Sequence, residues 1–169
     1  IVETAECWEL ALKDAGGPSV LALTRQNLPQ LRTEKASENL SAKGGYRLVA
    51  ATAERKVVLI ATGSEVEIAV ATAKALEEQG IGADVISMPS WAHFEAQPQA
   101  YKDDLLPHHV LRASIEAGTT FGWERYTGIA GLRFGIDSFG ASAPAPALYD
   151  YFGLTAAKIA PQIVAALNS

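Results

Sequence analysis

The chain has 169 residues, of which 49% are hydrophobic and 20% are charged, and its formal net charge is −5 at pH 7. This length suits one globular domain or slightly more, and the composition excludes a disordered chain, a collagen and a coiled coil. The acidic balance argues against sequence-independent nucleic-acid binding, which depends on clustered lysine and arginine. We therefore predict no nucleic-acid partner.

Cysteine content and hydropathy suggest a compartment. The single cysteine, Cys7, cannot form an internal disulfide, which favours a reducing environment. No apolar run reaches the roughly 18 residues that a membrane-spanning helix needs. We predict a cytoplasmic location and no membrane partner.

The first 33 residues contain one helix and one strand. Apolar side chains recur every three or four positions from Ile1 to Leu12, which predicts a helix over residues 1–14. The short apolar run Val20–Leu23 is typical of a strand buried on both faces of a parallel sheet. Residues 26–43 are polar and irregular and supply no neighbouring strand, so we expect the rest of this unit to precede Ile1.

A second pattern begins after residue 44. Strands are predicted at Tyr46–Ala50 and Lys56–Ala61, and their connection is too short for a parallel crossover. We expect these strands to be antiparallel, with the first at a sheet edge. A helix then begins at Ser64 and ends near Gly80 in a left-handed turn. A strand at Ala83–Met88 completes a parallel βαβ unit.

The remaining pattern alternates helices and strands up to the last residues. Pro161 should either kink the last helix or delay its start to Ala160. The expected fold class is α/β: about five strands in a mostly parallel sheet, with one antiparallel edge strand and helices on both faces. The further predicted elements are helices over 97–106, 121–131, 144–152 and 155–167 and strands over 110–115 and 132–136.

The turn Gly63–Ser64 follows a predicted buried strand and opens a helix, where backbone N–H groups favour an anion. The same residues also fit a capping box between Ser64 and Glu67. Glu65 and Glu67 already place negative charge there, and neither full glycine-rich nucleotide fingerprint is present. We favour the capping box over a nucleotide site.

Other candidate groups have no suitable partners. His108 and His109 are adjacent and project in different directions, and His93 stands alone, so no metal site is predicted. The acidic pairs Asp103–Asp104 and Glu77–Glu78 are expected on solvated helix faces. No catalytic residue is predicted among them.

Arg25 directly follows the predicted strand Val20–Leu23, at the end where parallel sheets bind ligands. Its planar, permanently charged guanidinium suits a phosphate or a carboxylate. A structural ion pair or a helix-capping contact would equally explain an arginine at this position. Position alone leaves both interpretations open.

Five motifs along the chain resemble, in order, the C-terminal third of bacterial transketolases. The Arg-Gln-Asn tripeptide separates this family from deoxyxylulose-phosphate synthases and pyruvate dehydrogenase β subunits. The motifs are TRQNLPQ at 24–30, ATGSEV at 61–66, SMPS at 87–90, EAG at 116–118 and FGASAPA at 139–145.

The resemblance implies an enzyme that uses thiamine diphosphate and Mg²⁺ or Ca²⁺ to move a two-carbon ketol unit between sugar phosphates, in the pentose phosphate pathway. It implies a homodimer. It also implies that residues 1–33 are the tail of the pyrimidine-binding domain, 34–41 a linker and 42–169 the whole C-terminal domain.

Arg25 matches the family's arginine that binds the substrate phosphate, and Thr24 stands where serine is more frequent. No other residue matches a catalytic, cofactor-binding or metal-binding position, so the chain alone is expected to be inactive. Pro161 and the loop Trp91–His93 depart from the family pattern. The alternative is a free-standing, non-catalytic ligand-binding or regulatory domain, which a chain that opens inside an α/β unit disfavours.

Overall fold

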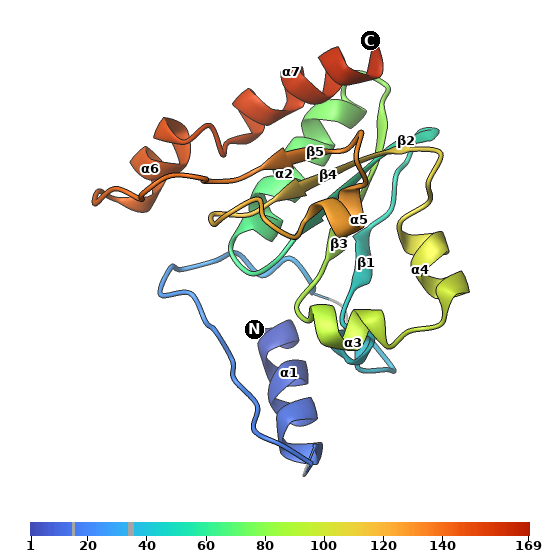
Figure 1. Ribbon diagram of the computed structural model, residues 1–169, viewed down its shortest axis with the longest axis vertical. Helices are drawn as coiled ribbons and strands as arrows, with labels where there is room; N and C mark the ends of the chain where they lie inside the picture. The colour runs from blue at the N-terminus through green and yellow to red at the C-terminus, as the bar shows by residue number, and fades with distance from the viewer. Residues whose placement is uncertain (15, 34–35) are drawn as a thin grey trace.

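The computed structural model describes residues 1–14, 16–33 and 36–169 and contains a five-stranded sheet of order β1-β3-β2-β4-β5 (Figure 1). The β1–β3 pair is antiparallel and the other three pairs are parallel, which confirms the predicted α/β class. The strands are β1 (Tyr46–Val49), β2 (Arg55–Ala61), β3 (Gly82–Ser87), β4 (Leu111–Ile115) and β5 (Leu132–Phe134).

Helices cover both faces of this sheet, and α1 lies apart from its main body (Figure 1). Among the described residues, no helix has both the length and the apolarity to cross a bilayer. The helices are α1 (Val2–Lys13), the short 3-10 helix η1 (Leu40–Lys43), α2 (Glu65–Glu77), α3 (Trp91–Glu95), α4 (Gln99–Leu105), α5 (Glu124–Thr127), α6 (Ala145–Tyr151) and α7 (Ala156–Leu167).

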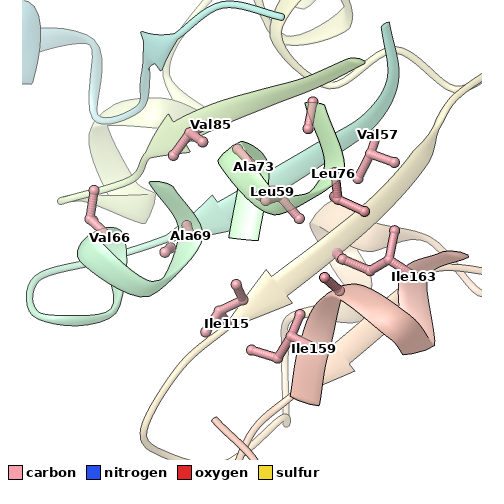
Figure 2. Close-up of a cluster of buried hydrophobic side chains, with 14 residues drawn as sticks. Val57, Leu59, Val66, Ala69, Ala73, Leu76, Val85, Ile115, Ile159 and Ile163 are labelled. Atoms are coloured by element: carbon pink, nitrogen blue, oxygen red, sulfur yellow. The ribbon is translucent and has the colours of Figure 1, made fainter. Parts of the chain in front are cut away.

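The core has two halves because successive side chains of a strand point to opposite faces. Val57 and Leu59 of β2 lie in the half that contains Ile159 and Ile163 of α7 and the buried face of α2 (Figure 2). Val58 lies in the other half, with buried side chains from the region of α3, α4 and α5. Burial on both faces explains why β2 is continuously apolar rather than alternating.

The helix α2 follows the predicted pattern closely. Its buried positions Val66, Ala69, Ala73 and Leu76 recur at helical spacing and pack on β2 and β3. Gly80 ends the helical region with φ of 75°, the left-handed conformation expected of it.

The edge position of β1 is confirmed, but its neighbour differs from the expected one. Tyr46 pairs with Ser87 of β3, so β3 separates β1 from β2 in the sheet. The short connection fixes the opposite directions of β1 and β2 without making them neighbours. Both sides of β2 are instead occupied by parallel strands, β3 and β4.

The strand predicted at Val20–Leu23 does not form. These residues are extended and unpaired within the described chain, and Val20 is 93% exposed. A strand exists only where a neighbour completes its hydrogen-bond ladder, and no described strand lies against this segment. The prediction of a buried strand at these residues is therefore wrong for this chain.

Two short helical regions also differ from expectation. The predicted loop Trp91–His93 is the start of α3, where the Ser90 hydroxyl accepts a hydrogen bond from the His93 backbone N–H at 3.3 Å. The helix predicted over 121–131 shrinks to α5. Gly122 and Gly128 bracket it with φ of 89° and 76°, which no right-handed helix allows.

The last helix runs through Pro161. It begins at Ala156, so the predicted later start at Ala160 is wrong. Proline lacks an N–H and therefore removes one hydrogen bond of the helix. Its ring is exposed, while Ile159 and Ile163 pack into the core and hold the helix in place.

The predicted linker 34–41 is only partly described. Residues 34 and 35 lie outside the described residues, and Leu40 and Ser41 already belong to η1. The Asn39 side chain caps η1 by accepting a hydrogen bond from the Ala42 N–H at 3.1 Å.

Candidate functional site

Arg25 lies in a bend at the far end of the extended segment that follows α1. Its side chain is exposed. Among the described residues, no carboxylate forms an ion pair with it. Within the described chain, therefore, the guanidinium has none of the structural ion pairs that would explain it without a ligand.

The backbone on both sides of Arg25 is held by its neighbours. The Thr24 hydroxyl accepts a hydrogen bond from the Gln26 backbone N–H at 3.2 Å, which closes a small turn with Arg25 at its centre. Serine at position 24 would preserve this contact. We call residues 24–26 the arginine turn.

The arginine turn is connected through Tyr149 of α6 to the part of the chain that contains the five-stranded sheet, residues 44–169, which we call the sheet domain. The Gln26 side-chain amide donates to the Tyr149 hydroxyl at 3.2 Å. That hydroxyl in turn donates to the carboxylate of Glu65 and lies 3.4 Å from the Ser64 hydroxyl. Segments far apart in the sequence thus meet in one continuous hydrogen-bond chain.

Glu65 is the anchor of this chain because it is only 5% exposed and opens α2. The positive end of the helix dipole favours a carboxylate at this place. The capping box predicted between Ser64 and Glu67 is absent, since Ser64 has a helical backbone and makes no side-chain cap. Its hydroxyl instead donates to Glu65 at 2.8 Å.

The carboxyl ends of β2, β3 and β4 border a cavity of about 990 Å³ next to this cluster. Thr24, Gln26 and Tyr149 line it together with Glu65 and Glu116. Ala61 pairs with Ile115, so the residues after β2 and after β4 lie side by side. Burial and the charge of Glu65 raise the pKa of Glu116 to about 7.

Beyond the arginine turn, the chain returns to α1 at Arg32, where ionic contacts join α1 to residues near β1. The Arg32 guanidinium donates to both carboxylate oxygens of Glu6 at 2.7 and 2.8 Å, and Ser41 donates to the same carboxylate at 2.7 Å. Burial opposes the charge, but these hydrogen bonds lower the pKa of Glu6 to about 2.

A second carboxylate of α1 binds the sheet edge directly. One oxygen of Glu3 accepts hydrogen bonds from the Tyr46 hydroxyl at 2.8 Å and the Ser87 hydroxyl at 2.5 Å. Tyr46 and Ser87 are partners in the β1–β3 register. Glu3, Glu6, Arg32 and Tyr46 form what we call the α1 anchor.

The histidines do not gather. No group of three or more metal-ligating side chains occurs among the residues that the structure describes. His93 contacts the Ser90 hydroxyl through Nδ1 at 2.9 Å, and His108 lies 3.8 Å from Asp103. These contacts are structural.

The sequence pointed to Arg25 and to the Ser64–Glu65 turn but not to the link between them. Tyr149 was missed because a tyrosine in a short helix has no signature in the sequence. The α1 anchor was missed because Glu6 and Arg32 are distant in the chain. The signal that the sequence did offer was the pair of carboxylates at Glu65 and Glu67, which need hydrogen-bond donors when they are buried.

Comparison with known proteins places the chain among transketolases. Residues 44–155 match the family model described as the transketolase-like TK C-terminal domain. A transketolase of Sinorhizobium medicae (strain WSM419) is 49% identical over 169 residues, covering 99% of this chain and 24% of the relative. A plasmid transketolase of Cupriavidus necator is 51% identical over 158 residues, covering 94% and 23%.

Solved structures agree. Transketolase from Leishmania mexicana superposes with a TM-score of 0.88 at 36% identity, covering 99% of this chain and 24% of that one. Transketolase from Pichia stipitis in complex with sedoheptulose-7-phosphate gives 0.87 at 39% identity, covering 98% and 24%. The chain spans about a quarter of the length of these relatives.

Proposed function

The chain belongs to the transketolase family, and from this premise we propose that it is the C-terminal part of an enzyme that transfers a two-carbon ketol unit between sugar phosphates. We propose that the complete enzyme works in the cytoplasm, in the pentose phosphate pathway, as a homodimer. The family membership and the sugar phosphate in a related structure support this proposal.

Thiamine diphosphate and Mg²⁺ or Ca²⁺ are the cofactors that we expect in the complete enzyme. The described residues of this chain do not fit the metal ion, because they contain no group of three or more metal-ligating side chains. We propose that this chain contributes binding and support and that it is inactive alone.

We propose that Arg25 binds the phosphate of the sugar substrate. An exposed guanidinium on a closed turn, with no ion-pair partner among the described carboxylates, carries the proposal. Such a group offers two parallel N–H donors to a phosphate and keeps its charge at every physiological pH. Holding the phosphate end of the sugar would orient the carbon atoms that react elsewhere in the enzyme.

The division of the chain into residues 1–33, 34–41 and 42–169 remains our proposal for the domains. The exposed apolar residues Val20 and Leu23 support it, because they look like a strand of a neighbouring sheet. The same exposure disfavours a free-standing regulatory domain. We propose that residues 42–169 support the dimer and the substrate-binding turn.

The test is Arg25→Ala in the complete enzyme. We expect KM for phosphorylated sugars to rise by a factor that corresponds to about 1.5 to 3 kcal/mol, the usual contribution of a charge-assisted hydrogen bond. Unphosphorylated sugars should react unchanged.

Arg125→Ala is the matched control, because Arg125 of α5 is also exposed but is paired with Glu95 at 3.2 Å. An equal loss for phosphorylated and unphosphorylated sugars in Arg25→Ala would refute the phosphate role.

A further inference from the structure

The arginine turn has a defined connection to the sheet domain. Among the described residues, its hydrogen bond to that domain runs from the Gln26 side chain to the Tyr149 hydroxyl, at 3.2 Å. The remaining hydrogen bond of the turn is internal, between Thr24 and the Gln26 backbone. Whatever fixes Tyr149 therefore also restrains the residue next to Arg25.

Tyr149 is itself firmly held. Its hydroxyl donates to Glu65, which is buried at the start of α2, and Glu65 also accepts a hydrogen bond from Ser64 at 2.8 Å. Helix α2 in turn packs on β2 and β3, the centre of the core. The chain of contacts from Gln26 to Glu65 thus ends at a helix that packs into the hydrophobic core.

The protonation states suit these roles. A tyrosine hydroxyl can donate one hydrogen bond and accept others, and Tyr149 donates to Glu65 while accepting from Gln26. Burial and the contact with Glu65 raise the pKa of Tyr149, so the hydroxyl keeps its proton. Phenylalanine would fill the same space without either hydrogen bond.

We propose that Tyr149 is a positioning residue for substrate phosphate: through Gln26 it holds the arginine turn against the buried carboxylate of Glu65. The inference rests on the proposed role of Arg25. It gives residues 42–169 a part in substrate binding that acts through the arginine turn. Pre-organisation of this kind lowers the entropy lost when the ligand binds.

The first experiment is Tyr149→Phe in the complete enzyme. We expect KM for phosphorylated sugars to rise about 2- to 10-fold, because the arginine turn loses its neutral hydrogen bond from Gln26 to Tyr149. The kcat and the KM for unphosphorylated sugars should be unchanged. Tyr151→Phe is the matched control, because Tyr151 lies in the same helix but is 76% exposed. It should behave as the unmodified enzyme does.

The double variant Arg25→Ala/Tyr149→Phe tests whether Tyr149 acts through Arg25. If it does, the double variant loses no more phosphate selectivity than Arg25→Ala alone. Additive losses would overturn the positioning role.

Hydrogen exchange on the complete enzyme provides a readout without activity. The backbone amide of Gln26 should exchange faster in Tyr149→Phe than in Tyr151→Phe, because the arginine turn loses its hydrogen bond to Tyr149. Equal exchange in both variants would overturn the proposal.

The outcomes separate the two proposals. If Arg25→Ala loses phosphate selectivity and Tyr149→Phe does not, the positioning role is wrong and the role of Arg25 stands. If Arg25→Ala retains selectivity, the phosphate role itself is wrong and the inference built on it is overturned.

Discussion

Two apolar segments of this chain have nearly the same composition and opposite environments. Val57–Ala61 forms the centre of the sheet and every side chain in it is buried. Val20–Leu23 is equally apolar, yet it lies extended along the surface, with Leu23 58% exposed. β2 has a strand on each side, whereas the described residues provide none for the earlier segment. Apolar sequence therefore supplies the tendency to form a strand, and neighbours decide whether it does.

The largest expected effect is on the buried side of this comparison. Leu59→Ala should lower the free energy of unfolding by about 2 to 5 kcal/mol, because it leaves a cavity between α2, α7 and the sheet. In the 169-residue chain, Leu23→Ala makes the same chemical change at an exposed site and should stay within about 0.5 kcal/mol. Urea unfolding of both variants measures the difference. Similar losses would mean that residues 20–23 are buried after all.

The α1 anchor connects helix α1 to Arg32 and to the sheet edge at Tyr46, and Glu6→Gln should weaken it. Replacing the carboxylate leaves Arg32 without its charged partner, so we expect the docking of α1 to lose about 1.5 to 3 kcal/mol. Hydrogen exchange should accelerate in α1 and stay unchanged in β2. Lys13→Gln is the control, because the exposed Lys13 ammonium pairs with Glu9 of the same helix.

The pH dependence of the anchor has a definite sign. The pKa of Glu6 is lowered to about 2 in the folded chain, so its contribution to stability is complete above the usual value of 4.5. This contribution declines below pH 4.5 and is lost as the pH falls through 2. Protection of α1 that is constant from pH 6 to pH 2 would contradict this account.

The smallest effect is expected at Glu116, beside the cavity. Its folded pKa of about 7 exceeds the usual 4.5, so stability falls as the pH rises between these values. Glu116→Gln should remove that slope and raise the free energy of unfolding at pH 8 by about 1 to 2 kcal/mol, once solvent screening is allowed for. Urea unfolding from pH 4 to 8 checks it, with exposed Glu67→Gln as the control.

Periodicity predicted the sheet domain well because its signals are local. The spacing of Val66, Ala69, Ala73 and Leu76 determines α2 without reference to any other element. The same logic failed at Val20–Leu23, where the deciding information lies in a neighbouring strand.

At the candidate site, the sequence identified the groups but not their partners. Arg25 was recognised by its place in the chain and by family resemblance. The contact of Gln26 with Tyr149 joins residues 123 positions apart, and no local sequence pattern in either segment predicts it. Contacts of this kind emerge only when the fold brings distant segments together.

The pairing of β1 with β3 rather than β2 also dictates an order of assembly. Tyr46 leaves the ribosome well before Ser87, its partner, and cannot settle until β2, α2 and β3 have come together. Glu3 binds both hydroxyls of that pair, so this contact of α1 forms only when Tyr46 and Ser87 are in register. Helix α1 precedes β1 in the chain, yet its Glu3 contact is complete only after β3, which comes later in the sequence, has paired with β1.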